Sequence, residues 1–257
     1  PGPTGVFGTT AGLEERFGAE RVLDMPASEN AMTGVALGTA LMGRRPIMIH
    51  IRVDFAVLAM EPLVNQVAKW HYMYGGKMTA PLTVRIIIGR GWGQGPQHAQ
   101  SLQAWFAHVP GLKVVMPTTA HDAKGMLIAA VEDDAPVILF EHRWLYNVSG
   151  PVPEEMYRVP LDRAATLRRG RHVTLAGTSY MTLECLKAAD FLAQIGIDAE
   201  VIDLRSLAPI DVPALTESVG RTGHLVVADT GDVQFGTGSE VCAAVVERAF
   251  TALKAAP

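Results

Sequence analysis

Cysteine is scarce in this sequence, and so is any excess of one charge. The 257 residues include only two cysteines, Cys185 and Cys242, which lie far apart without the close spacing of a metal-binding or redox pair. Both are predicted to be reduced core residues, as in the cytoplasm. The formal net charge is −4 and no run of Lys or Arg stands out, so the chain has no basic surplus to neutralise the phosphates of a nucleic acid.

A long hydrophobic run is also missing. The most apolar helical stretch, residues 31–43, is interrupted by Gly and Thr and falls short of the roughly 18 to 20 apolar residues that a membrane span needs. The sequence opens without an initiator Met or a signal-peptide pattern, so we interpret it as trimmed rather than targeted. Hydrophobic residues make up 49% of the chain, which is enough for a sizeable core. We therefore expect a globular cytoplasmic protein without a membrane span.

Short β-rich runs alternate with segments of helical period along the whole chain. This alternation predicts an α/β fold with a mostly parallel sheet, and the near-continuous apolar character of the runs predicts that helices cover both faces. The predicted strands are residues 46–51, 82–88, 112–116, 136–141, 172–177, 198–204 and 224–229.

Helix boundaries are marked by capping residues. Ser28 or Asn30 can cap a helix that ends at Gly43, and Thr119 can cap a helix that runs to about residue 133. Pro62 falls inside a further helical stretch, where it removes a backbone donor. That helix must start late, kink, or carry Pro62 in its first turn.

The composition of the sequence changes after Tyr146, where Pro and charged residues replace the periodic hydrophobic pattern. Such a change is typical of a domain connection. We predict a first domain at 1–150, a linker at 151–168 and a second, smaller α/β domain at 169–257. The second domain shows only three clear strands, so we expect it to be incomplete, with a further strand beyond Pro257.

Two motifs carry candidate chemistry. Glu29 follows a short apolar segment in DMPASEN and opens a helix, where a carboxylate commonly does no more than balance the helix dipole. His98 ends the Gly-rich loop GRGWGQGPQH, which follows a strand and can be a ligand-binding loop or merely an irregular turn. His50 and Arg52, at the end of another strand, fit either a site or hydrogen-bonded core groups. The residues alone leave these alternatives open.

The sequence lacks the characteristic motifs of several enzyme classes. The sequence has no HExxH, no CxxC pair and no GxSxG, which excludes the usual metalloprotease, zinc-site and serine-hydrolase arrangements. It also has no GDG followed some 25 to 30 residues later by Asn, the magnesium-diphosphate signature of thiamine enzymes.

Five ordered segments, taken together, resemble one family. They are MPASENAMTGVALGTALMGRRPI, VNQVAKWHYMYGGK, the long run from GPQHAQSLQAWFAHVPGLKVV to PVILFEH, VIDLRSLAPID and QFGTGSEV. The sequence resembles the beta subunit of thiamine diphosphate-dependent 2-oxo acid dehydrogenases, of the pyruvate and branched-chain type. The resemblance implies a transketolase-like pyrimidine-binding domain at 1–150 and a transketolase C-terminal domain at 169–257.

The resemblance also implies roles for individual residues. Glu29 matches the family glutamate that shares a proton with the aminopyrimidine ring of the cofactor, and Phe55 matches the aromatic residue that stacks on that ring. His98 matches the histidine beside the substrate or the docking lipoyl group. Leu58 belongs to the same cofactor site, but it stands where relatives often have Gln. In some relatives a loop binds potassium through backbone carbonyls, and the matching residues are Leu82, Ala130, Val131, Asp133 and Ala135.

The implied enzyme decarboxylates a 2-oxo acid and passes the acyl or aldehyde unit to an acceptor such as a lipoyl group. It works with an alpha subunit that binds magnesium and the diphosphate, as an α2β2 heterotetramer, and it can serve a lipoyl acyltransferase. The loop IIIGRGWGQG departs from the more usual GPNG-like run, so the substrate pocket can differ from that of pyruvate dehydrogenase.

Two alternatives stay open. The first is the C-terminal half of a split transketolase or a deoxyxylulose-phosphate synthase-like carboligase, which needs several Arg or His groups for a substrate phosphate. The loop around His98 offers only Arg90 for that purpose. The second is a non-catalytic assembly module, against which the presence of both Glu29 and His98 speaks.

Overall fold

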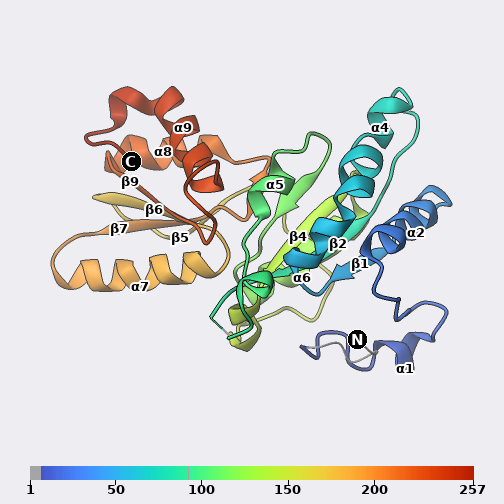
Figure 1. Cartoon of the computed structure of the whole chain (residues 1–257). Helices are drawn as coiled ribbons and strands as arrows, with labels where there is room; N and C mark the ends of the chain where they lie inside the picture. Colours follow the sequence, from blue (N-terminus) through green and yellow to red (C-terminus); the bar gives the residue numbers. More distant parts are fainter. Residues whose placement is uncertain (1–6, 92) are drawn as a thin grey trace.

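The computed structural model describes residues 7–91 and 93–257, and it contains two β-sheets, each covered by helices. In Figure 1, strands β1 to β4 and the helices around them run from blue to yellow-green, and the second sheet with its helices runs from yellow-orange to red. The predicted α/β class is confirmed.

The first sheet has five strands in the order β1-β2-β4-β3-β8. The first four of these run parallel, and β8 pairs with β3 in the antiparallel direction. Their bounds are β1 (Ile47–His50), β2 (Thr83–Ile88), β3 (Lys113–Val115), β4 (Val137–His142) and β8 (Ser206–Ala208).

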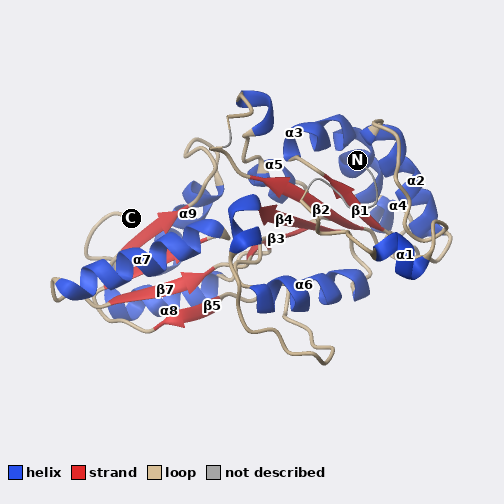
Figure 2. Cartoon of the chain, turned by 90° about the horizontal axis from the view of Figure 1, so that it is seen from below, coloured by secondary structure: helices blue, strands red, loops and turns tan. Residues whose placement is uncertain are grey.

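Helices cover both faces of this sheet, as the apolar strands predict. In Figure 2, α6 lies on one side of the red strands and α3 and α5 lie on the other. The bounds are α1 (Leu13–Phe17), α2 (Glu29–Leu41), α3 (Val53–Ala56), η1 (Val57–Ala59), η2 (Pro62–Val67), α4 (Trp70–Met73), η3 (Pro96–His98), α5 (Gln103–Ala107), α6 (Ala120–Glu132) and η4 (Arg143–Asn147).

Alternate residues of one strand enter two different cores. Ile138 and Phe140 of β4 pack in a cluster with α2, α3 and η2, whereas Val137 and Leu139 pack against Met126 of α6 and its neighbours. Burial on both sides explains the continuous apolar run Val137–Phe140 in this strand.

The second sheet has four strands in the order β5-β7-β6-β9. Its residues divide between a core with α8 and α9 and a core with α7. The bounds are β5 (Ala165–Arg168), β6 (Val173–Gly177), α7 (Tyr180–Gln194), β7 (Ala199–Asp203), α8 (Val212–Thr222), β9 (Leu225–Ala228), α9 (Thr237–Ala249) and η5 (Phe250–Ala252).

A seam of polar contacts joins the two sheets where β8 reaches β3. Arg205, just before β8, donates two hydrogen bonds to the carboxylate of Asp122 in α6, at 2.8 and 2.9 Å. Asp122 is 1% exposed and the Arg205 side chain 17%, so this is a buried ion pair. The backbone carbonyl of Arg205 also accepts from the N–H of Met116 at 2.7 Å. The seam fixes how the second sheet meets the first.

The seven predicted strands all form, and the expected cap at Thr119 is present, because its hydroxyl accepts from the backbone N–H of Asp122 at 3.0 Å. Ser28 stands at the N-cap of α2 but makes no side-chain capping bond there. Around Pro62 the expected single helix is divided into short α, 3-10 and π segments. Strand β5 lies in the segment expected to be a linker, so the second sheet begins before residue 169.

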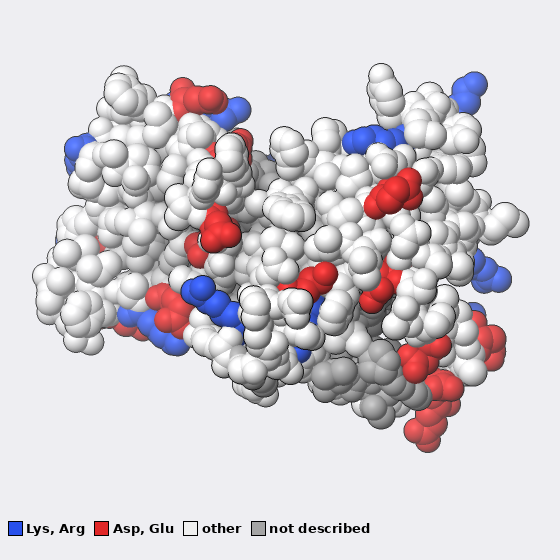
Figure 3. Space-filling model, in the orientation of Figure 1, with Lys and Arg blue, Asp and Glu red and all other residues white. Residues whose placement is uncertain are grey.

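On the face drawn in Figure 3, acidic and basic side chains are interspersed among uncharged ones, so neither sign of charge dominates that face. None of the helices in the described part of the chain is long and apolar enough to cross a bilayer.

Candidate functional site

The candidate residues lie around the carboxyl ends of β1, β2 and β4. These strands are parallel neighbours, so their carboxyl ends share one edge of the sheet. His50 ends β1, His142 ends β4, and the Gly-rich loop that leads to His98 follows β2. In parallel α/β sheets this edge is where ligands bind.

Glu29 is the first residue of α2 and lies close to the end of β1. Thr33, one helical turn later, donates a hydrogen bond to the Glu29 backbone carbonyl at 2.8 Å, and its hydroxyl lies 3.4 Å from Nε2 of the buried His50. Burial lowers the pKa of His50 to about 4, although the negative charge of Glu29 acts in the opposite direction. His50 is therefore a neutral imidazole at pH 7.

Phe55 and His98 are brought together from two short helices, α3 and η3. Their ring centroids lie 5.3 Å apart in an edge-to-face arrangement, and Phe55 keeps 38% of its surface exposed. Among the described residues, the buried Nδ1 atom of His98 has no hydrogen-bond partner. Leu58, one turn beyond Phe55, is 63% exposed. An exposed aromatic ring beside an imidazole nitrogen without a hydrogen-bond partner can bind a ligand that is both aromatic and polar.

Two arginines that the sequence does not single out as a pair converge beside His98. Arg52 donates to the backbone carbonyl of His98 at 3.1 Å and also to the side-chain oxygen of Gln94. Arg143 donates to that same Gln94 oxygen at 3.2 Å. The exposed fractions of Arg52 and Arg143 are 6% and 1%. Two positive charges thus meet on one neutral amide oxygen at the sheet edge.

His142 lies next to this cluster and is buried between aromatic rings. It stacks on Tyr180 at 5.0 Å and meets Trp144 edge-on at 5.9 Å. Burial, with the nearby charges of Arg143 and Arg90, lowers its pKa to about 4. These ring contacts give His142 a structural role, and its neutral state keeps a third positive charge out of the cluster.

The glycines of the loop are required by this packing. Gly89 has φ +124°, and a Cβ there would meet the Arg143 side chain at 2.8 Å. Gly91 has φ +89°, and a Cβ there would meet Trp144 at 2.8 Å. At both positions the backbone has a positive φ and a side chain would collide with a neighbour. Glycine is therefore needed in this loop for the packing at the sheet edge.

The residues matched to a potassium site do not fit such an ion in this structure. Arg45 donates to the backbone carbonyls of Val131 and Asp133, at 3.0 and 2.8 Å. The carbonyl of Leu82 accepts from the backbone N–H of Val137 in the sheet. Lys113 also pairs with the Asp133 carboxylate. A guanidinium on two of the five proposed ligands would repel a potassium ion placed among them.

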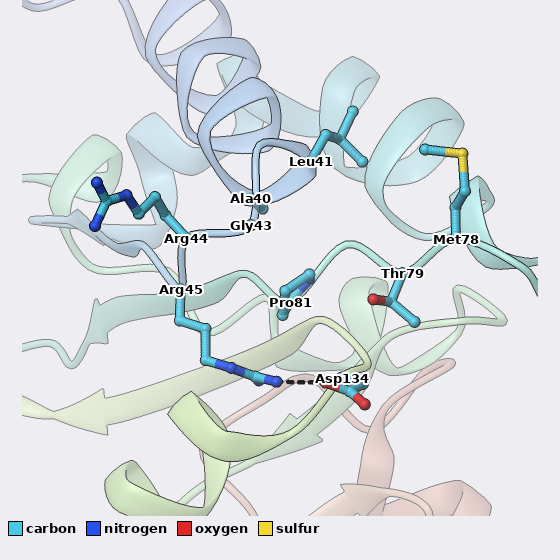
Figure 4. Close-up of a pocket in the computed structure, with 9 residues that line it drawn as sticks. All are labelled: Ala40, Leu41, Gly43, Arg44, Arg45, Met78, Thr79, Pro81 and Asp134. Atoms are coloured by element: carbon cyan, nitrogen blue, oxygen red, sulfur yellow. Dashed lines mark hydrogen bonds and ion pairs between the residues drawn. The ribbon is translucent and has the colours of Figure 1, made fainter.

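Figure 4 shows this corner, where Arg45 extends toward Asp134 at the rim of a hollow and the neighbouring Arg44 points away from it. Nitrogen and oxygen of the Arg45–Asp134 pair lie 2.5 Å apart. Within the described ranges, no group of three or more His, Cys, Asp or Glu residues could hold a metal ion.

Two family matches cover nearly the whole chain. Residues 3–149 match the family described as "Transketolase, pyrimidine binding domain", and residues 162–257 match "Transketolase, C-terminal domain".

Curated relatives are similar over almost the full chain. The beta subunit of acetoin:2,6-dichlorophenolindophenol oxidoreductase from Cupriavidus necator is 43% identical over 251 residues, covering 98% of this chain and 74% of that protein. The mitochondrial pyruvate dehydrogenase E1 component subunit beta-2 of Oryza sativa subsp. japonica is 40% identical over 255 residues, covering 98% and 68%.

A solved structure agrees with the fold. It is titled a split gene transketolase, inactive beta4 tetramer, and superposes with a TM-score of 0.77 at 29% identity, covering 93% of this chain and 75% of the other.

Proposed function

Because the chain belongs to the transketolase-like family of thiamine diphosphate-dependent 2-oxo acid dehydrogenase beta subunits, we propose that it forms the pyrimidine-binding half of a decarboxylating active site. In this role the enzyme decarboxylates a 2-oxo acid and passes the remaining unit to an acceptor such as a lipoyl group. The main supporting observation is the sheet edge at which Phe55 lies against His98, with the His98 Nδ1 atom unsatisfied among the described residues.

The residues at this edge fit the pyrimidine end of the cofactor. The exposed face of Phe55 suits stacking on a flat heteroaromatic ring, and Glu29, held at the start of α2, offers a carboxylate to a ring nitrogen. Leu58 adds apolar surface one turn beyond Phe55. When bound, thiamine diphosphate supplies the nucleophilic carbon and the electron sink for the loss of carbon dioxide.

Each side chain then has a defined task. Glu29 holds or accepts a proton at the pyrimidine nitrogen, Phe55 orients the ring and excludes water from one face, and His98 moves a proton or stabilises charge on the substrate side. Arg52 positions His98 through the bond to its backbone carbonyl.

The second half of the cofactor site belongs, in our proposal, to a separate alpha subunit. The described residues offer no acidic cluster for magnesium, and the magnesium-diphosphate signature is absent from the sequence. We propose an α2β2 heterotetramer that can serve a lipoyl acyltransferase. The cytoplasm is our proposed location, supported by two free cysteines.

The same proposal divides the chain into a pyrimidine-binding domain at 1–150, a connection at 151–168 and a transketolase C-terminal domain at 169–257. The ranges of the two family matches support this division. The exchange of β8 into the first sheet means that the two domains are packed rather than flexibly tethered.

Calorimetric titration tests the two-subunit proposal. Magnesium and thiamine diphosphate are titrated into the isolated chain, and then into the chain mixed with its candidate alpha partner. Glu29 and Phe55 hold only one end of the ligand, through a hydrogen bond and a stacking contact worth together about 2 to 4 kcal/mol. We therefore expect millimolar or weaker binding alone and tight binding with the partner. Micromolar binding by the isolated chain would overturn the proposal.

A further inference from the structure

A carboxyl group at the end of the second sheet is bonded to the helix that follows the His98 loop. The Asp229 Oδ1 atom accepts from the side-chain amide of Gln103 at 2.8 Å and from the Thr178 hydroxyl at 3.0 Å. It also accepts from the backbone N–H of Thr230 at 2.8 Å. Gln103 is the first residue of α5, whereas Asp229 directly follows β9. One carboxyl oxygen therefore joins the second sheet to the start of α5.

The Gln103 side chain is held in one orientation by this contact. Gln103 is 0% exposed, and among the described residues its Oε1 atom has no hydrogen-bond partner. Turning the amide over would place that oxygen against the Asp229 oxygen, and two acceptors cannot bond to each other. Within the described part of the chain, the bond to Asp229 is therefore what fixes the buried polar end of Gln103.

The loop after β9 approaches the same segment closely at Gly231. A Cβ at Gly231 would lie 3.2 Å from the Gln103 amide nitrogen and 3.6 Å from the backbone carbonyl oxygen of Ser101. A larger side chain there would press the loop away from α5. Glycine therefore permits the approach that the bond between Gln103 and Asp229 requires.

The chain between His98 and α5 is also fixed from the side of the first sheet. Arg52 donates to the His98 carbonyl at 3.1 Å, and the Gln100 side chain donates to a carboxyl oxygen of Asp54 at 2.8 Å. Arg52 and Asp54 belong to the start of α3, the short helix with the candidate stacking ring. Only residues 99–102 lie between His98 and α5, so a displacement of the helix start is passed on to the imidazole.

We propose that Asp229 is a positioning residue for His98. It holds the first turn of α5 through Gln103, and thereby sets where the imidazole lies beside the Phe55 ring. This inference rests on the proposed function, because it concerns the geometry of the same site. A displacement of about 1 Å in a reacting group can lower a rate by about 100-fold, so a small shift of His98 has a measurable effect. The second domain then contributes to turnover through a residue that acts on another residue.

The activity test uses the enzyme reconstituted from this chain and its alpha partner, with thiamine diphosphate and magnesium. The substrate is whichever of pyruvate, 2-oxobutanoate and 3-methyl-2-oxobutanoate is turned over fastest. Gln103→Leu removes the bond to Asp229 but keeps a buried side chain, and kcat should fall by about 10- to 100-fold. Asp229→Leu removes the same bond from the other side and should act alike. The conservative variant Asp229→Asn keeps an oxygen that accepts from Gln103, so it should restore kcat to within about threefold of the original.

Combination with His98→Ala separates positioning from a general structural defect. The effect of a residue that acts through His98 disappears when the imidazole is absent. In the His98→Ala chain, Gln103→Leu should therefore change the residual kcat by about twofold or less. An equal loss of kcat in both chains would show that Gln103 and Asp229 only support the fold, and it would overturn the inference. An unchanged kcat in His98→Ala itself would remove His98 from the reaction and the positioning role with it.

Hydrogen exchange of the full chain without cofactor gives a readout that does not depend on activity. Backbone amides of residues 98–108 should exchange about 5- to 10-fold faster in Gln103→Leu and at nearly the original rate in Asp229→Asn. Thr118→Val is the matched control. The Thr118 hydroxyl also donates between the two halves of the chain, to the Ser179 carbonyl at 3.1 Å, but from the loop after β3. Thr118→Val should change neither kcat nor exchange in this segment, and unchanged exchange in Gln103→Leu would overturn the inference.

Two outcomes distinguish this inference from the proposed function. Turnover of a 2-oxo acid by the original chain, with kcat unchanged in Gln103→Leu and Asp229→Leu, leaves the proposed function standing and overturns the positioning role. Absence of turnover with every 2-oxo acid tested overturns the proposed function. The exchange experiment then decides by itself whether Asp229 holds the His98 segment.

Discussion

Arginine plays two different parts in two regions of this molecule. At the seam between the sheets, Arg205 donates both of its hydrogen bonds to the carboxylate of Asp122, and the pair is electrically complete. At the carboxyl edge of the first sheet, Arg52 and Arg143 share the neutral oxygen of Gln94. A charge that pairs with a buried carboxylate serves stability, whereas charged groups gathered at the carboxyl edge of a parallel sheet lie where ligands bind. The comparison predicts that changes at the edge affect activity and that changes at the seam affect stability.

The largest effect is expected at the edge. Glu29→Gln keeps the shape of the side chain but removes the proton-sharing carboxylate, so kcat of the reconstituted enzyme should fall by about 10² to 10⁴. The free energy of unfolding should stay within about 0.5 kcal/mol of the original value. Glu240→Gln is the control, since Glu240 is likewise an acidic residue in the first turn of a helix, α9. Activity of Glu29→Gln within about twofold of the original would remove Glu29 from the site.

The opposite pattern is expected at the seam. Arg205→Leu leaves the Asp122 carboxylate buried without its partner, and breaking a buried pair in this way costs about 3 to 5 kcal/mol of stability. Urea unfolding of the chain measures the loss. Arg158→Leu breaks the exposed pair with Glu132, whose side chains are 49% and 48% exposed, and should cost about 1 kcal/mol or less.

A second seam variant shows which charge is responsible. The double variant Asp122→Leu with Arg205→Leu also removes the Asp122 carboxylate that the single variant leaves without its partner, so stability should recover part of the loss. If Arg205→Leu were no more destabilising than Arg158→Leu, the buried ion pair at the seam would contribute no more to stability than an exposed pair does.

A smaller effect, visible through pH, is expected from His142. Its pKa is lowered from 6.5 to about 4 in the folded chain, mainly by burial. Below pH 6.5 the unfolded chain takes up a proton that the folded chain does not, so the stability contributed by the neutral imidazole is lost as pH falls toward 4. The loss attributable to this one group is about 1 to 3 kcal/mol.

Urea unfolding at pH 7 and at pH 4.5 measures this contribution. His142→Asn should lose less stability between the two pH values than the original chain does, because the titrating group is gone. His108→Asn, at the exposed end of α5, controls for the removal of an imidazole as such. An unchanged pH dependence in His142→Asn would show that His142 is protonated alike in both states.

The fold was more accessible to sequence reasoning than the edge was, for physical reasons. Strands such as β2 and β4 are mostly apolar because both faces are buried, and that signal is local. Strand β8 has only three residues and pairs with β3 from the other half of the chain, so no local pattern marks it. Helix α8 was not predicted either, although Asp211 and Pro213 at its start form a recognisable N-terminal signal.

The candidate site shows the same limit. The motifs around Glu29 and His98 mark both residues as candidates but leave a structural reading open, whereas Phe55 and the roles of all three come from the family resemblance and remain predictions. Arg52 follows β1 and Arg143 follows β4, which are separated by β2 in the sheet, so only the completed topology brings their guanidiniums together. The sequence signal available in advance was the departure of the loop IIIGRGWGQG from the family pattern, which carries Gln94.

The smallest expected effect concerns potassium. It extends the comparison between the seam and the edge to Arg45, which lies in a third region of the molecule. Arg45 donates to the carbonyls of Val131 and Asp133, which belong to the residues matched to a potassium loop. A guanidinium in this position already supplies the positive charge that the turn between α6 and β4 would otherwise take from an ion. We therefore expect the melting temperature of the chain to be the same in potassium chloride and in sodium chloride at equal ionic strength, within about 1 °C.

Removing the guanidinium should create the dependence that the original chain lacks. In Arg45→Met the two carbonyls lose their donor, so potassium should bind there and raise the melting temperature by a few degrees over sodium, as expected for a ligand that binds only the folded state. Arg44→Met is the matched control, because the adjacent arginine points away from this corner (Figure 4) and should leave both salts equivalent. Thermal unfolding followed by circular dichroism in the two salts provides the measurement. Specific stabilisation of the original chain by potassium would contradict this prediction. It would mean that the ion binds at the turn although Arg45 is present, so that Arg45 does not replace it.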